Sequence, residues 1–206
     1  MNVAAPTSQD LRIRASINSP IADLVPGWFD PGREDGRLRL HVGGAFPRAG
    51  WKILNIQPGP RVDFVDNCCD LSRFATGSVS TIYASHVLEH LGFREALPRA
   101  LIEIRRVLNP GGPFLMSVPD LAVLSRLFLD ERLDAQERMT AMMMMFGGQI
   151  DEHDFHHVGL YREFVADLLA GVGFKTVHQV ARLGIFPDSS DAMLHGQSIS
   201  LNLIVS

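Results

Sequence analysis

The side chains best suited to chemistry in this sequence are histidines, which gather in two short runs. The first run, SHVLEH, covers residues 85–90, and the second, DEHDFHH, covers residues 151–157. Histidine has a reference pKa of about 6.5, so a neutral ring can remove a proton from a reacting oxygen or nitrogen. We take His86 as the first candidate for a catalytic base and His156 as the second. Contacts to a substrate are expected from Glu89, His153, His157 and Tyr161, and the alternative for the second run is a solvated polar loop.

The first run also fits a zinc-binding pattern. His86, Glu89 and His90 match H-x-x-E-H, in which two histidines four residues apart bind zinc. That pattern requires a helix, whereas here it directly follows the apolar β-type run VSTIYA. A third ligand would have to come from downstream, where the candidates have no assigned place beside the motif: Glu103, Glu131 and Glu137. We therefore predict no metal site and keep a zinc-dependent hydrolase as a minor alternative.

Short β-type runs precede these residues and must position them. In chain order they are RLRLHV, KILNI, RVDFV, VSTIYA and PFLMSV, with glycines and prolines in the turns between them. Between the last two runs, apolar residues recur at three- and four-residue spacing over residues 95–108. This predicts a helix with Pro98 in its first turn. Strand, helix, the turn at residues 109–112 and the next strand form a βαβ unit, and such units place their strands parallel.

The second half of the chain adds three predicted helices and two closing strands. Asp120 is placed to cap a helix, and Gly147 and Gly148 are placed to end the next one. The strands are KTVHQVARL and SISLNLIV. Inward-facing positions are predicted at Leu121, Leu124 and Phe128 in the first helix, and at Phe164, Val165, Leu168 and Leu169 in the third. A Met-rich stretch is expected to fill the core, with an adaptable lid over a substrate as the alternative: Met139, Met142, Met143, Met144, Met145 and Phe146.

The overall pattern predicts one α/β domain. Residues 1–35 carry four prolines and little periodicity, so we expect an irregular N-terminal arm. Residues 36–206 are enough for one full-sized core and too few for two. Because strands alternate with helices, we expect a Rossmann-like fold with a mostly parallel central sheet and helices on both faces.

Ligands of an open parallel sheet bind beyond the carboxyl ends of its strands, and the run YASHVLEHL begins at such a strand end. That run and RVLNPGGPFLMSVPDL resemble the second half of class I S-adenosylmethionine (SAM)-dependent methyltransferases, and FGGQIDEHDFHHVGLYREFVADLLAGVGF is similar to the same group. The similarity begins at Leu38 and is closest to small predicted methyltransferases associated with surface-polysaccharide biosynthesis. It implies the class I methyltransferase fold, SAM as cofactor with S-adenosylhomocysteine as product, and O-methylation of a small-molecule or carbohydrate-linked acceptor.

The resemblance also implies which residues hold the cofactor. The glycine-rich turn whose backbone approaches the amino-acid end of SAM corresponds to Gly43-Gly44-Ala45. The acid that binds the ribose hydroxyls corresponds to Asn55, and the acid that binds the adenine amino group corresponds to Asp70, with Leu71 next to it. Ser85 and His86 correspond to residues beside the sulfonium and the acceptor.

Two of these positions depart from the family pattern. Ala45 stands where the family usually has a third glycine, and Asn55 stands where it has an acid. Asparagine accepts through one carbonyl oxygen and carries no charge, so ribose binding should weaken by about 1–3 kcal/mol. The structural alternative for Asn55 is a strand-end turn residue. These departures support a second hypothesis, in which the chain is a catalytically weakened, methyltransferase-like binding module.

Composition argues against several other function classes. The formal net charge is −4 and no basic cluster is present, so nucleic acid is not an expected partner. We find no secretory signal and no run of about 20 apolar residues, and we expect a cytoplasmic protein without a membrane span. The two cysteines, Cys68 and Cys69, are sequence neighbours and cannot form a disulfide framework. The identity of the acceptor and the oligomeric state stay open.

Overall fold

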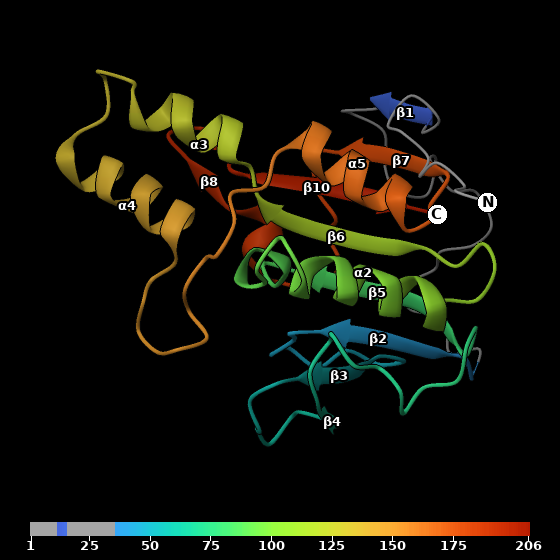
Figure 1. Ribbon diagram of the computed structural model, residues 1–206. Helices are drawn as coiled ribbons and strands as arrows, with labels where there is room; N and C mark the ends of the chain where they lie inside the picture. Colours follow the sequence, from blue (N-terminus) through green and yellow to red (C-terminus); the bar gives the residue numbers. More distant parts are fainter. Residues whose placement is uncertain (1–11, 16–35) are drawn as a thin grey trace.

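A computed structural model describes the backbone of residues 12–15 and the whole of residues 36–206. In these ranges an eight-stranded sheet has the order β1-β7-β10-β6-β5-β2-β3-β4 (Figure 1). Neighbouring strands run parallel except at β10, which is antiparallel to β6 and β7. The predicted mostly parallel sheet is therefore confirmed. Its strands are β1 (Arg12–Ala15), β2 (Leu38–Val42), β3 (Lys52–Asn55), β4 (Phe64–Val65), β5 (Val79–Ser85), β6 (Phe114–Pro119), β7 (Thr176–Val180) and β10 (Ser200–Val205).

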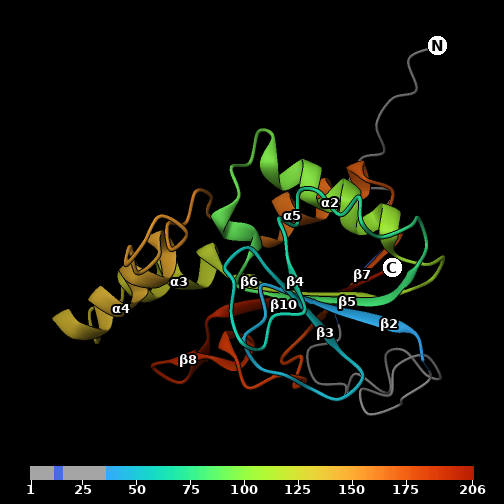
Figure 2. The ribbon, with the colours of Figure 1, turned by 90° about the horizontal axis from the view of Figure 1, so that it is seen from below.

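One face of the sheet is covered by two helices. Figure 2 shows α2 (Ala96–Val107) and α5 (Arg162–Gly171) side by side over the strands. Alternation along the strands sends Ile82 and Ala84 to this face, and α2 buries Leu97, Leu101 and Ile104 against it. Pro98 lies in the first turn of α2, as predicted, where its missing N–H breaks no helical hydrogen bond.

The opposite face carries a second apolar cluster. Tyr83 and Leu115, which alternate with the residues of the first face, pack there with Trp51 and Phe186. Phe186 belongs to the segment between β7 and the short helix η3 (Ser189–Asp191). Burial on both faces explains why the central strands are almost continuously apolar.

Two further helices extend beyond the carboxyl end of β6. Figures 1 and 2 both show α3 (Leu121–Phe128) and α4 (Ala135–Phe146) at one end of the sheet. Asp120 caps α3 as predicted, accepting hydrogen bonds from the N–H groups of Ala122 and Val123. A small apolar cluster packs α3 and α4 against the hairpin of β8 (Met193–Leu194) and β9 (Gln197–Ser198).

Several local predictions need correction. Residues 12–15 were expected in an irregular arm but form a strand, because β7 offers a free edge to pair with. The run 61–65 forms a strand only at Phe64–Val65. In α3, Leu127 is buried and Phe128 is exposed, because this helix packs on α4 instead of on the sheet. In α5, Val165 and Leu169 are buried as predicted, whereas Phe164 and Leu168 pack at the edge of the core.

No helix in the described part of the chain is long and apolar enough to cross a membrane.

Candidate functional site

A cavity of about 610 Å³ lies beyond the carboxyl ends of β2, β3, β4 and β5. This is the end of the sheet at which ligands bind in open parallel sheets. Residues of the loop that follows α4 form its other wall. The lining residues are Val42, Gly43, Leu54, Asn55, Ile56, Gln57, Asp66, Asn67, Cys68, His86, Val87, His90, Leu91, Ile150, Asp151, Glu152, His153, Asp154 and His157.

The glycine-rich turn after β2 meets the cavity at Gly43. Its φ of 71° is one that side chains disfavour, and a Cβ there would lie 2.2 Å from Cγ2 of Val87. Gly44 is buried against His41, where a Cβ would lie 2.6 Å from the ring. Ala45, the position where the family usually has a third glycine, is exposed and does not line the cavity, so its methyl group does not narrow the cavity.

Asn55 lines the cavity, but both ends of its amide are engaged by the backbone. Its Nδ2 donates to the carbonyl of Gly44 at 3.2 Å, and its Oδ1 accepts from the N–H of Gln57 at 3.0 Å. The side chain therefore acts as the strand-end turn residue that the sequence offered as its structural alternative. One lone pair of Oδ1 is left for a ribose hydroxyl.

Asp70, the acid expected to bind the adenine amino group, does not lie at the cavity. Asp70 is exposed, accepts from the N–H of Ser72 at 3.1 Å and does not line the cavity. Leu71 is fully buried in the core. The cofactor contacts expected at Asp70 and Leu71 are therefore corrected. In this segment of the chain the acid that lines the cavity is Asp66, which directly follows β4 and is followed by Asn67. Asp66 directly follows the predicted run RVDFV, so the strand-end rule alone points to it, whereas the family resemblance pointed to Asp70.

Ser85 faces the other side of the sheet. Its Oγ donates to the carboxylate of Asp188 at 3.1 Å, and the same carboxylate accepts from the hydroxyl of Tyr83 at 2.8 Å. Ser85 does not line the cavity, because residues 83 and 85 alternate with those on the cavity side. The predicted cofactor contact at Ser85 is therefore not supported.

His86 lines the cavity in an unusual backbone conformation, with a φ of 53°. Its Nε2 lies 2.9 Å from the hydroxyl of Ser200, which itself donates to the carbonyl of Ser189. Since that hydroxyl uses its proton on the carbonyl, Nε2 of His86 must be the donor, and Nδ1 carries the lone pair. Burial lowers the pKa of His86 to about 4, so the ring is neutral near pH 7 and can accept a proton.

Glu89 is the buried acid of the site and lies just behind the cavity wall. Its side chain is 1% exposed, and neither carboxylate oxygen has a hydrogen-bond partner. Burial raises the pKa of Glu89 to about 8, because a charged carboxylate without donors is costly in an apolar surrounding. The nearest cationic candidates are imidazoles: Nδ1 of His86 at 3.6 Å and Nε2 of His156 at 3.9 Å. Glu89 is therefore not a direct contact to a bound substrate.

The His-rich loop contributes His153 and His157 to the cavity wall, and their contact with a substrate stays a prediction. The backbone N–H groups of His157 and Val158 donate to the carbonyl of Glu89 at 2.8 and 3.3 Å, which ties the loop to the 3-10 turn η2 (Leu88–His90). His156 points to Glu89 and does not line the cavity, which argues against a base in direct contact with an acceptor.

The substrate contact expected at Tyr161 is corrected, and the Met-rich stretch fills the core only in part. Tyr161 precedes α5 on the surface, stacks on Phe164 and stays outside the cavity. No residue of the Met-rich helix lines the cavity either. Met144 and Met145 pack against the small cluster under α3, whereas Met139 and Met143 are exposed.

The zinc pattern of the sequence is not built as a helical site. It follows β5 through the strained residue His86 and ends in one 3-10 turn, so its two histidines do not share a helix face. The structure instead brings His156 to Glu89 and His90. Sequence spacing could not show this, because His156 is contributed by a loop far along the chain.

Comparison with known proteins gives this region a family likeness. Residues 51–116 match the family model described as a methyltransferase domain. The matched segment runs from Trp51, just before β3, into β6 and includes Asn55, His86 and Glu89. No curated protein matches the sequence.

Solved structures of methyltransferases share the fold. A SAM-dependent methyltransferase from Archaeoglobus fulgidus has a TM-score of 0.53 and 14% identity, covering 85% of this chain and 88% of that one. An O-methyltransferase family protein from Burkholderia thailandensis has a TM-score of 0.50 and 15% identity, covering 82% and 50%. The chain spans half the length of the CurJ carbon methyltransferase structure, with a TM-score of 0.49, 15% identity and 89% of this chain covered. The family likeness thus covers residues 51–116, and the solved structures show that the fold is shared with methyltransferases.

Proposed function

We propose that this chain is a SAM-dependent methyltransferase that transfers a methyl group to an oxygen of a small-molecule or carbohydrate-linked acceptor. The observation that carries the proposal is the cavity at the strand ends of the methyltransferase domain, with a glycine turn on one side and histidines on the other. Its volume of about 610 Å³ lies in the usual range for small-molecule sites. We also propose a cytoplasmic location, where the free thiols of Cys68 and Cys69 would stay reduced.

The residues present fit the cofactor in three places. Gly43 exposes backbone where a Cβ would collide with Val87, which suits close approach of the amino-acid end. Asn55 offers one oxygen lone pair at the end of β3. Asp66, whose carboxylate lies 3.3 Å from Arg73, and Asn67 supply polar groups in the position once expected of Asp70. Bound SAM would supply a methyl group on a positively charged sulfur.

The acceptor side of the proposal rests on the histidines. His86 is neutral, has its lone pair on Nδ1 and lines the cavity, so we assign it the removal of the acceptor proton. Hydrogen bonding to Ser200 fixes the ring and its tautomer. His153 and His157 would contact the acceptor from the opposite wall. A hydroxyl acceptor must lose a proton during transfer, and His86 is the group that would take it, which supports O-methylation.

Ligand binding tests the proposal first. Purified protein should show a higher unfolding temperature with S-adenosylhomocysteine and bind about one equivalent by calorimetry. Turnover is then measured as S-adenosylhomocysteine released from SAM over a panel of hydroxylated small molecules and glycosides. Changing His86→Ala should lower kcat by about 10²–10⁴-fold with little effect on S-adenosylhomocysteine affinity. His195→Ala, an exposed histidine beside Glu137, serves as the matched control. Full turnover by the His86 variant would remove this residue from the mechanism.

A second candidate function, a weakened methyltransferase-like binding module, is favoured by the amide of Asn55. Both of its polar atoms bond to the backbone, so ribose recognition is poorer than an acid would give. Changing Asn55→Asp keeps the acceptor for the N–H of Gln57 and adds a charge. If ribose is bound here, S-adenosylhomocysteine affinity should rise about tenfold, the equivalent of about 1.4 kcal/mol. If neither the unchanged protein nor the Asn55→Asp variant binds S-adenosylhomocysteine, the binding module is favoured over the enzyme.

A further inference from the structure

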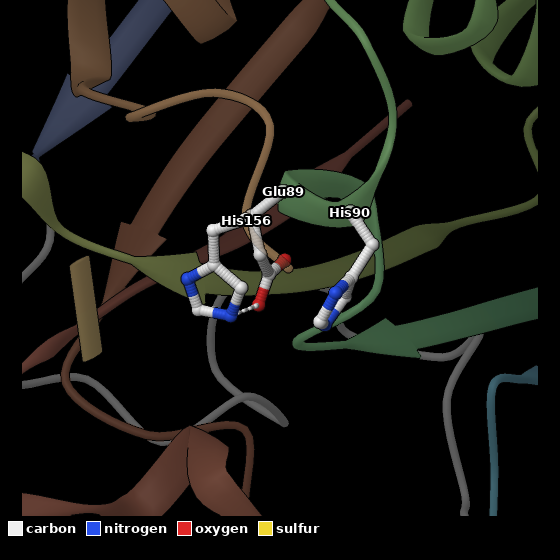
Figure 3. Close-up of side chains that lie close together, drawn as sticks. All are labelled: Glu89, His90 and His156. Carbon is white, nitrogen blue, oxygen red and sulfur yellow. Dashed lines mark ion pairs between the residues drawn. The ribbon is translucent and has the colours of Figure 1, made fainter. Parts of the chain in front are cut away.

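Glu89, His90 and His156 form a compact cluster that the proposed methyl transfer does not use. Their ligand-capable atoms all lie within 4.8 Å of one another. Figure 3 shows the carboxylate of Glu89 between the two imidazole rings, with the rings of His90 and His156 arranged edge to face. Two of these residues come from η2 and one from the loop after α4, so only the fold brings them together.

The carboxylate in this cluster lacks the partners that a buried acid needs. Both oxygens of Glu89 are buried and neither receives a hydrogen bond. The 3.9 Å from Oε1 to Nε2 of His156 and the 3.6 Å to Nδ1 of His86 are too long for hydrogen bonds. A buried carboxylate is stable when it is paired with a cation or coordinates a metal. The cluster therefore has a place for a cation that its own side chains do not fill.

The rings of the two histidines are held as in metal sites. Nδ1 of His90 lies 3.1 Å from the carbonyl of Phe155, and since a carbonyl only accepts, Nδ1 carries the proton and Nε2 the lone pair. The ring of His156 lies beside the end of α4, near the backbone of Met144 and Met145, and presents Nε2 to Glu89 at 3.9 Å. Such outer hydrogen bonds to carbonyls orient histidine ligands and set their tautomer.

The backbone around the cluster is also fixed. The carbonyl of Glu89 accepts the N–H groups of His157 and Val158, and the N–H of His156 donates to the carbonyl of Phe146 at 3.1 Å. At Gly147 the φ is 84°, and a Cβ would lie 2.0 Å from the carbonyl oxygen of Asp154. The loop that supplies His156 is thus tied to both η2 and α4, so the ligands are largely preorganised.

We propose that Glu89, His90 and His156 bind a divalent transition metal of the Zn²⁺ type. Two imidazoles and one carboxylate are a ligand set for such metals, and three protein ligands leave a coordination position open. Metal–ligand distances of about 2.0–2.2 Å require a small closing movement of the side chains. Because His90 also lines the cavity, the metal would lie at the cavity wall. The set differs from the pattern in the sequence, since His156 takes the place of His86.

Metal binding by the untagged full chain tests this site without reference to methyl transfer. Protein stripped with a chelator is dialysed against Zn²⁺, and bound zinc is measured by mass spectrometry. About one equivalent should bind, and Co²⁺ in its place should give the visible absorption of a four-coordinate site. Glu89→Gln and His156→Ala should each weaken Zn²⁺ binding by at least about tenfold. His153→Ala, in the same loop, and His195→Ala should bind Zn²⁺ like the unchanged protein.

Other results would overturn the site. Zinc binding that is absent, or that persists in both cluster variants, means that these residues do not hold a metal. Equal loss in the His153 variant would point to a different set of loop histidines. Circular dichroism and thermal unfolding show that each variant is folded, and Glu89→Gln preserves the shape of the side chain. Because S-adenosylhomocysteine binding is measured separately, failure of the metal site and failure of the proposed function can be told apart.

Discussion

At the scale of single residues, Gly43 links the backbone to the shape of the cavity. Its positive φ turns the chain away from β2, and its N–H donates to the carbonyl of Leu54 at 2.7 Å. Val87, from the segment after β5, packs where a side chain would otherwise lie. The residue thus holds two strand ends together and leaves backbone facing the cavity.

Changing Gly43→Ala should therefore affect stability and ligand binding together. The left-handed conformation costs about 1–2 kcal/mol for a residue with a Cβ, and the contact with Val87 adds strain. We expect the free energy of unfolding in urea to fall by about 2–4 kcal/mol. Binding of S-adenosylhomocysteine should weaken as well. Gly92→Ala is the control, since no atom lies within 4 Å of its added methyl group and its φ is not positive. Equal stability of the two variants would contradict the role given to Gly43.

At His86 and Glu89 the protonation state depends on burial and not on residue type alone. His86 and Glu89 are separated by one turn, yet burial lowers the pKa of the first to about 4 and raises the pKa of the second to about 8. Both are uncharged near pH 7. Ser200 and Ser189, from the far end of the chain, decide which nitrogen of His86 holds the proton.

At the scale of elements, α3 depends on the residue that joins it to the sheet. Asp120 directly follows β6, donates its N–H to the carbonyl of Ile199, and caps α3 by accepting from the N–H groups of Ala122 and Val123. The helix has only eight residues, so its own hydrogen bonds contribute little without the cap.

Changing Asp120→Ala should lower the free energy of unfolding by about 1 kcal/mol, within a range of about 0.5–2 kcal/mol. Chemical denaturation followed by circular dichroism measures this. Asp120→Asn keeps an oxygen that can accept from the helix N–H groups, so it should retain most of the stability. If both variants lose the same amount, the charge of Asp120 and not its capping geometry is the source.

At the scale of the whole molecule, the cluster opposite α2 and α5 encloses a histidine. His41 is 3% exposed and packs against Phe186, with 4.0 Å between ring centroids, and edge-on to Tyr83. Burial lowers the pKa of His41 to about 4, from 6.5 in an unfolded chain, while Asp188 acts in the opposite direction. Folding therefore requires this ring to be neutral.

Stability should consequently fall in mild acid. Between pH 6.5 and about 4, His41 is protonated in the unfolded chain but stays neutral in the folded chain. The contribution of His41 to the free energy of unfolding is therefore complete above pH 6.5 and is lost as the pH falls. One proton corresponds to about 1.4 kcal/mol per pH unit. The raised pKa of Glu89 acts oppositely, so the test compares the protein with His41→Phe. The difference between their unfolding free energies should change with pH below 6.5 and be constant above it. A difference independent of pH would contradict a neutral His41.

The sequence by itself determined the parts of this protein that depend on neighbours along the chain. Apolar runs of the right length specified the central strands, spacing specified α2, and Asp120 and Gly147 specified where helices begin and end. These features rest on local hydrogen bonding and on which face of an element is apolar. Residues directly after well-defined strands, such as Gly43 and His86, were found at the cavity for the same reason.

Tertiary structure alone decided the rest of the site. Which acid of the segment after β4 lines the cavity depends on how its turns fold, and so Asp66 is there and Asp70 is not. The face of the sheet on which Ser85 lies follows from strand alternation. The meeting of His156 with Glu89, and the pKa of each, follow from burial between segments far apart in sequence. Desolvation and long-range contacts are properties of the packed molecule, and no local pattern encodes them.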